Sequence, residues 1–117
     1  MSSVEDSLCR LLEVPGVAGA ALFDAVTGLN YGKVGAGEVD GIEFSQLATL
    51  ISDQLYIAGA EGGLESIVVT GARHQVVLRT LPRQGFSLLL TATLEREEAN
   101  LALVLHQLDL YAAGAAG

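Results

Sequence analysis

The chain has 117 residues but no tryptophan, one cysteine, two prolines and few charged side chains. Because Cys9 is the only cysteine, no disulfide can form within the chain, as is usual for proteins of a reducing compartment. Aromatic residues make up only 5% of the sequence, so a core must consist mainly of aliphatic side chains. No apolar run approaches the roughly 18 to 20 residues that cross a bilayer. We therefore expect no insertion into a membrane.

Positive charge is scarce as well. The 6 Lys and Arg residues stand against 14 Asp and Glu residues, which leaves a formal net charge of -8. A surface of this sign repels phosphate backbones, so the charge balance argues against nucleic-acid binding. The opening MSSVEDS is acidic where a secretory signal is basic. These features predict a cytoplasmic protein with no nucleic-acid partner.

Residues that could carry catalysis or hold a metal are few and scattered. Cys9, His74 and His106 have unrelated spacings that match no zinc pattern. Cys9 lies among the leucines of the first helix with no histidine close in sequence, so we expect a small packed side chain rather than a nucleophile. The glycines of GKVGAG lack the order of a phosphate-binding loop. The sequence therefore predicts no catalytic residue, metal or cofactor, and no enzymatic activity.

Hydrophobic periodicity divides the chain into three helices and five strands. Apolar residues recur every three or four positions in the helical segments, whereas branched residues between turns that contain Gly or Pro mark the strands. The acidic run EREE fits the first turn of the last helix, where carboxylates meet the positive end of the helix dipole. The expected helices are Ser3–Glu13, Ile42–Ala60 and Arg96–Tyr111, and the expected strands are Val17–Asp24, Leu29–Val34, Leu64–Thr70, Gln75–Leu81 and Phe86–Leu94.

These elements predict a single α+β domain over residues 1–111, in the order αββαβββα. The short connections between the last three strands require antiparallel pairing. The segment FSLLLTATL is apolar at adjacent positions, which is typical of a central strand buried on both faces. Residues 112–117, with the sequence AAGAAG, lack bulky side chains and are expected to form a flexible tail.

Three segments resemble the roadblock/dynein light chain domain family. LLEVPGVAGAALFDAVTGL, at Leu11–Leu29, is similar to its opening signature, in which a helix ends at Pro-Gly and a strand runs into an Asp and a Gly turn. ESIVVTGARHQVVLRTL resembles the third and fourth strands of the family, and LEREEANLALVLHQL resembles its last strand-to-helix junction. Ala102 departs from the pattern, since many members have Gly there. The resemblance implies a profilin-like or longin-like sandwich, with a five-stranded antiparallel sheet, two helices on one face and one on the other.

The resemblance also implies a function. Family members pair through the middle helix and the third strand, and they commonly act as scaffolds or regulators of small Ras-like GTPases. Some bacterial members activate GTP hydrolysis by such a partner. The expected function is therefore a non-enzymatic homodimeric regulator or scaffold for a small Ras-like GTPase. One alternative is a structural assembly or light-chain subunit without a GTPase partner. Another is a small-molecule sensor, which needs a roomy cavity, whereas this core is expected to be filled with Leu and Val.

The middle helix is apolar over more of its circumference than one packed face requires. With successive residues about 100° apart, six apolar residues at 44, 47, 48, 51, 55 and 58 face the sheet, and five polar ones at 45, 46, 49, 52 and 53 face water. Leu50 and Ile57 remain on one shoulder, where exposure forgoes roughly 1.5 to 3 kcal/mol each. Either a second copy or another part of the same chain covers them. For a second copy, the expected interface is Glu43, Leu47, Leu50, Gln54 and Ile57 of the helix with Glu65, Ile67 and Val69 of the third strand.

Three arginines, Arg73, Arg79 and Arg83, lie on or beside one predicted hairpin. An arginine supplied in trans can stabilise the transition state of GTP hydrolysis. The alternative is that these side chains only keep an acidic protein soluble, and we favour this second interpretation.

Overall fold

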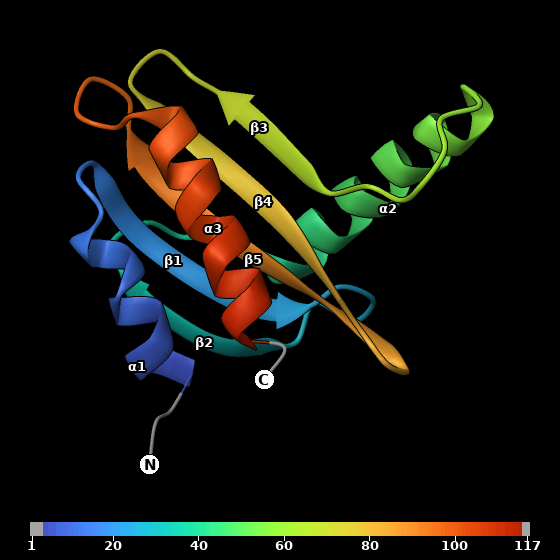
Figure 1. The fold of residues 1–117 in the computed structure, drawn as a ribbon, viewed down its shortest axis with the longest axis horizontal. Helices are drawn as coiled ribbons and strands as arrows, with labels where there is room; N and C mark the ends of the chain where they lie inside the picture. Colours follow the sequence, from blue (N-terminus) through green and yellow to red (C-terminus); the bar gives the residue numbers. More distant parts are fainter. Residues whose placement is uncertain (1–3, 116–117) are drawn as a thin grey trace.

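Five strands form one antiparallel sheet in the order β2-β1-β5-β4-β3 (Figure 1). The computed structural model describes residues 4–115. In the sheet, Leu22 of β1 lies opposite Leu90 of β5, and Val77 of β4 lies opposite Ala92 of β5. The elements are α1 (Val4–Cys9), a short 3₁₀ turn (Leu11–Glu13), β1 (Val17–Asp24), β2 (Asn30–Gly35), α2 (Gly41–Ile57), β3 (Ser66–Thr70), β4 (His74–Arg83), β5 (Phe86–Glu95) and α3 (Leu101–Ala115).

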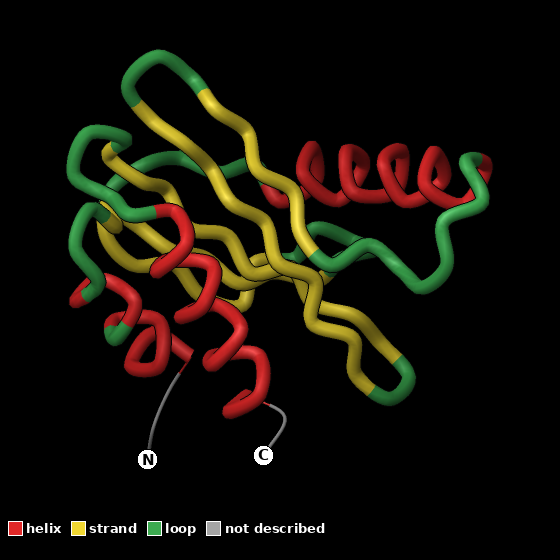
Figure 2. The backbone as a smooth tube through the Cα atoms, turned by 45° about the horizontal axis from the view of Figure 1, so that its top comes forward, coloured by secondary structure: helices red, strands yellow, loops and turns green. Residues whose placement is uncertain are grey.

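Helices cover both faces of this sheet. α1 and α3 pack on one face and α2 lies on the other (Figure 2). The central strands β1 and β5 alternate their side chains between two cores, which we name the α1/α3 core and the α2 core. This arrangement confirms the predicted sandwich of two helices, sheet and one helix. The α1/α3 core includes Leu8, Leu11, Leu22, Leu90, Val104 and Leu108, and the α2 core includes Ala21, Phe23, Ala48, Leu78 and Leu89.

The first helix is shorter than predicted. α1 ends at Cys9, and the chain continues as the 3₁₀ turn up to Glu13. Val14 is already extended, with φ -73° and ψ 127°, because the residue before a proline is disfavoured in the helical region. Gly16 then takes φ 87°, and a Cβ there would lie 2.5 Å from the backbone of Ala99. Ser3, where the helix was expected to begin, lies outside the described residues.

The last helix differs from prediction at both ends. It begins at Leu101 instead of Arg96, and Asn100 caps it by accepting a hydrogen bond from the Leu103 amide at 3.1 Å. The acidic run therefore lies at the end of β5 and in the turn that follows, where the Ala99 amide donates to the Glu95 carbonyl at 2.9 Å. At its other end the helix continues to Ala115, so residues 112–115 belong to α3 rather than to a tail. Residues 116–117 lie outside the described part of the chain.

α2 begins at a capped residue. Asp40 is extended, and its Oδ1 accepts hydrogen bonds from the amides of Ile42 at 2.9 Å and Glu43 at 3.1 Å. These are two of the amides that a helix start leaves without an internal partner. The cap therefore fixes the residue at which α2 begins.

Replacing Asp40 by alanine is expected to lower the free energy of unfolding by about 0.5 to 2 kcal/mol, because both amides lose their acceptor. Urea denaturation followed by circular dichroism measures this loss as a lower midpoint at unchanged slope. Asp40→Asn keeps a side-chain oxygen and is the matched control, and it should lower the free energy of unfolding by only a few tenths of a kcal/mol. An equal loss in both variants would mean that charge, and not the acceptor, is what matters.

Small residues set how α2 meets the sheet. Ser45 and Ala48 are its two buried residues, with exposed fractions of 5% and 8%. The prediction that Ser45 faces water is therefore wrong, and Ser52 is half-buried as well. The Ser45 hydroxyl donates to the Ile42 carbonyl at 3.1 Å, so its burial leaves no donor unpaired. The larger side chains of Leu47, Ile51 and Leu55 are only half-buried.

A candidate interaction surface on α2 and β3

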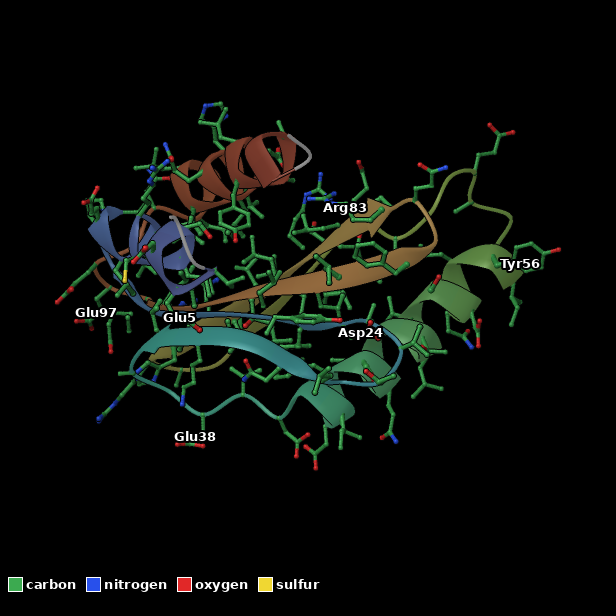
Figure 3. All side chains as sticks on the ribbon, turned by 90° about the horizontal axis from the view of Figure 1, so that it is seen from below. Glu5, Asp24, Glu38, Tyr56, Arg83 and Glu97 are labelled. Carbon is green, nitrogen blue, oxygen red and sulfur yellow. The ribbon has the colours of Figure 1, made fainter. Side chains whose placement is uncertain are left out.

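The C-terminal half of α2 projects beyond the sheet. Figure 1 shows the helix continuing past the edge formed by β3, and Figure 3 places Tyr56 at its far end. Tyr56 is 83% exposed, and no residue from Leu50 to Ile57 is fully buried. A long apolar helix that leaves its own core in this way offers a surface for another molecule.

Leu50 and Ile57 are the largest apolar side chains on the predicted shoulder. Their exposed fractions are 63% and 74%. The structure therefore rules out the alternative that described residues of the same chain cover them. Glu43 and Gln54 are exposed beside them, and Leu47 is half-buried. We name these five helix residues the α2 flank.

β3 supplies the second predicted segment of the surface. It is an edge strand, paired only with β4, and its sequence SIVVT contains neither charge nor proline. Val69 is 45% exposed, and Glu65, just before the strand, is also exposed. Ile67 packs partly against the α2 core, so its own protomer already uses part of that side chain. The free backbone groups of β3 are a template for another strand.

The opposite edge of the sheet is different. β2 carries Lys33, whose ammonium lies 3.6 Å from a carboxylate oxygen of Glu38. Its pairing with β1 also shifts register between Leu22 and Phe23. Lysine side chains and irregular pairing both discourage strand addition. The two edges of the sheet are therefore unequal, and the bare one is β3.

Cys9, His74 and His106 lie on three different elements, α1, β4 and α3. Within residues 4–115 no cluster of three His, Cys, Asp or Glu side chains could hold a metal ion. His106 is exposed on α3, and His74, the first residue of β4, lies 3.2 Å from Glu95. The expectation that Cys9 is packed is wrong, because α1 turns Leu8 into the core and leaves its last residue exposed.

The three arginines do not converge. Arg79 pairs with Asp109 of α3 at 2.9 Å, and this pair ties β4 to the helix above it. Arg83 is the last residue of β4 and lies on the face of the sheet opposite α2 (Figure 3), where it donates to the carbonyl of Pro82. Arg73 is exposed in the turn before β4. Two of the three are thus engaged within their own domain.

Asp24 orders the turn between β1 and β2. Its Oδ1 accepts hydrogen bonds from the amides of Thr27 and Val26, each at 2.8 Å. These bonds, led by the one from Thr27, hold the pKa of Asp24 below its usual value. Asp24 therefore has a structural role in this turn. The turn also requires Gly28, which has φ 76° and where a Cβ would lie 2.6 Å from the Ile42 amide.

A groove that the sequence did not predict lies between α2 and the sheet, and it shares no residue with the α2 flank. It has a volume of about 380 Å³ and runs between α2 and the ends of the β1–β2 and β4–β5 hairpins. Thr49 and Asp53, expected only to face water, line it together with Leu64, Thr80 and Leu89. No sequence signal could have identified the groove, because its walls come from distant segments of the chain.

No helix within residues 4–115 is both long and apolar enough to span a membrane.

Comparison with solved structures identifies the fold. The Roadblock/LC7 domain from Streptomyces avermitilis has a TM-score of 0.79 at 18% identity, over 97% of this chain and 94% of that one. An MglB with a tetrameric arrangement has a TM-score of 0.80 at 18% identity, over 95% of this chain and 83% of that one. The gliding protein MglB from Thermus thermophilus has a TM-score of 0.76 at 16% identity, over 92% of this chain and 81% of that one. No protein-family model and no curated protein matches the sequence. The resemblance seen in the sequence is therefore confirmed at the level of the fold.

Proposed function

We propose that this chain, whose fold is that of the Roadblock/LC7 domain, is a cytoplasmic, non-enzymatic regulator or scaffold that forms homodimers and binds a small Ras-like GTPase. The observation that carries the proposal is the exposed α2 flank beside the bare edge of β3. Both features provide a surface for protein recognition.

Self-association is supported by the exposure of Leu50 and Ile57. Two flanks that meet about a two-fold axis would each cover the other, so Leu50 and Ile57 leave water in both copies at once. Covering them recovers roughly 1.5 to 3 kcal/mol for each side chain. Antiparallel pairing of two β3 strands about the same axis would give their free amides and carbonyls partners.

The GTPase partner is supported by likeness and by the kind of surface present. MglB, a gliding protein, shares the fold over most of this chain, and the family resemblance implies regulation of a Ras-like GTPase. A protein without catalytic groups of its own influences hydrolysis by binding, that is, by holding the nucleotide-binding loops of its partner in one arrangement.

The GTPase proposal is tested with the chain as bait in an extract of the cell that makes it. We expect a Ras-like GTPase to be recovered and to hydrolyse GTP faster when the purified chain is added. Recovery with an unchanged rate would support the scaffold role. Failure of every Ras-like GTPase of that cell to bind the purified chain would overturn the regulator proposal and favour a structural subunit without a GTPase.

A further inference from the structure

We propose that the groove between α2 and the two hairpin ends binds a segment of a partner protein in which an arginine or lysine lies next to a large apolar residue. The inference goes beyond the proposed function, because the groove lies outside the surface assigned to dimerisation. It rests on the shape, the floor and the hydrogen-bonding capacity of the groove.

The floor of the groove is apolar. Leu89, which is fully buried, and Ala48 and Leu64 form part of its lining. Val26 stands at its rim with an exposed fraction of 82%, which is large for a branched aliphatic side chain. The volume of about 380 Å³ falls within the range of about 300 to 1,000 Å³ of known binding pockets. An apolar side chain that entered would bury itself and cover Val26.

The polar wall of the groove offers more acceptors than donors, although the hydroxyls of Ser52 and Ser87, which make no hydrogen bond within residues 4–115, each keep a proton to donate. The Thr49 hydroxyl gives its proton to the Ser45 carbonyl, and the Thr80 hydroxyl gives its proton to the Leu64 carbonyl. A hydroxyl has one proton, so both oxygens are left as acceptors. Asp53 adds a carboxylate that has no ion-pair partner among residues 4–115.

Charge decides which kind of group fits this wall. No residue that lines the groove carries a positive charge, and the whole chain has a formal net charge of -8. A guanidinium or ammonium group carries only donors and a positive charge, so it complements acceptors around a carboxylate. An acidic group would face the carboxylate of Asp53, and a neutral acceptor would find only the hydroxyls of Ser52 and Ser87 as side-chain donors. The combination of an apolar floor and an anionic wall therefore specifies a cationic side chain beside an apolar one.

The groove and the α2 flank have no residue in common, but they adjoin on the helix. Thr49 and Ser52 line the groove next to the buried Ser45 and Ala48, whereas Asp53, at the edge of the groove, is one turn before Ile57 and about 60° around the helix from Leu50. A second copy docked on the flank would therefore contact the helix beside Asp53. Groove residues away from the helix, such as Val26 and Ser87, separate binding in the groove from self-association.

The test is an NMR titration of the ¹⁵N-labelled chain at about 0.15 M salt, where long-range attraction is screened. The probe is a capped tripeptide with arginine between two leucines. We expect amide shifts at Thr49, Asp53 and Ser87, and binding roughly twofold to fivefold tighter than that of the same peptide with glutamine in place of arginine. Replacing the leucines by glycine should weaken binding by at least about tenfold.

Two variants assign the binding to the groove. Asp53→Asn should abolish the preference for arginine over glutamine and leave the glutamine peptide unaffected. Thr49→Phe should fill the groove and weaken both peptides, whereas Gln46→Phe, at an exposed position of the same helix, should weaken neither.

Other occupants give different results, and each of these results would overturn the proposal. Equal binding of the glycine peptide would mean that only the overall negative charge attracts it. Butylguanidinium that binds as tightly as the peptide would indicate a small cationic ligand. Shifts of Val26 and Ser87, the groove residues away from α2, that grow with chain concentration alone would indicate a second copy in the groove. A preference for arginine that survives in Asp53→Asn would place the cation elsewhere.

Discussion

Leu50→Glu is expected to convert the homodimer into single chains. The substitution places a carboxylate where each copy is expected to bury a leucine, and two-fold symmetry repeats the loss in the partner. Losing two buried leucines costs roughly 3 to 6 kcal/mol per dimer, which weakens association by roughly 140-fold to 20,000-fold. Sedimentation equilibrium should show the mass fall from twice 12.1 kDa to 12.1 kDa. Because Leu50 is 63% exposed in the single chain, circular dichroism should change little.

Leu110→Glu is the matched control for this prediction. Leu110 is 52% exposed on α3, on the other face of the sheet, so the same change is made to a leucine of similar exposure. Its dimer mass should equal that of the unaltered chain. If the Leu50→Glu variant remained a dimer while the Leu110→Glu variant dissociated into single chains, the interface would lie on α3 and its placement on α2 would be wrong. A single-chain mass for the unaltered protein would overturn the homodimer itself.

Phe23→Ala is expected to be the most damaging single change to the fold. Phe23 is fully buried on β1, between the sheet and α2, and belongs to the α2 core. Truncating it leaves a cavity lined by Leu78, Leu89 and Ala48, and such changes cost about 3 to 5 kcal/mol. A domain of this kind is stable by only about 5 to 15 kcal/mol in total. Urea denaturation should therefore show a strongly lowered midpoint.

The control for Phe23→Ala is Phe86→Ala. Phe86 is 52% exposed at the β4–β5 turn, so the same truncation there should cost less than about 1 kcal/mol. Both variants should be measured in the Leu50→Glu background, because dimerisation would otherwise add a concentration-dependent term to stability. Similar losses at the two positions would contradict the assignment of Phe23 to the α2 core.

Much of the fold could be predicted from local pattern. β1 has the predicted bounds, Val17–Asp24, because a run of small and branched residues ends at an Asp that closes a turn. The start of α3 could not be predicted, because the acidic run suits a helix N-terminus as well as the turn it occupies. A contact between distant segments decides it: the Arg96 amide donates to the Arg73 carbonyl, which holds the chain at the end of β5.

The candidate surface was predictable in part. The surplus of apolar residues on the middle helix singled out Leu50 and Ile57, and the structure decides between the two alternatives because both are exposed. The burial of Ser45 could not be inferred, because its polarity suggests exposure and only the close approach of α2 to the sheet explains it. Asp53 likewise gains its neighbours in the groove from β4, β5 and the hairpin turns, which no helical pattern reveals.

The inequality of the two sheet edges bears on how far assembly can proceed. A sheet with two adhesive edges can add copies without end and grow into a fibre. In this domain the lysine and the irregular register of β2 discourage growth on one side, while β3 remains available on the other. When a β3 strand pairs with its own counterpart, both available edges are used up. Growth by strand addition would therefore stop at two chains, and polymerisation through the sheet is avoided.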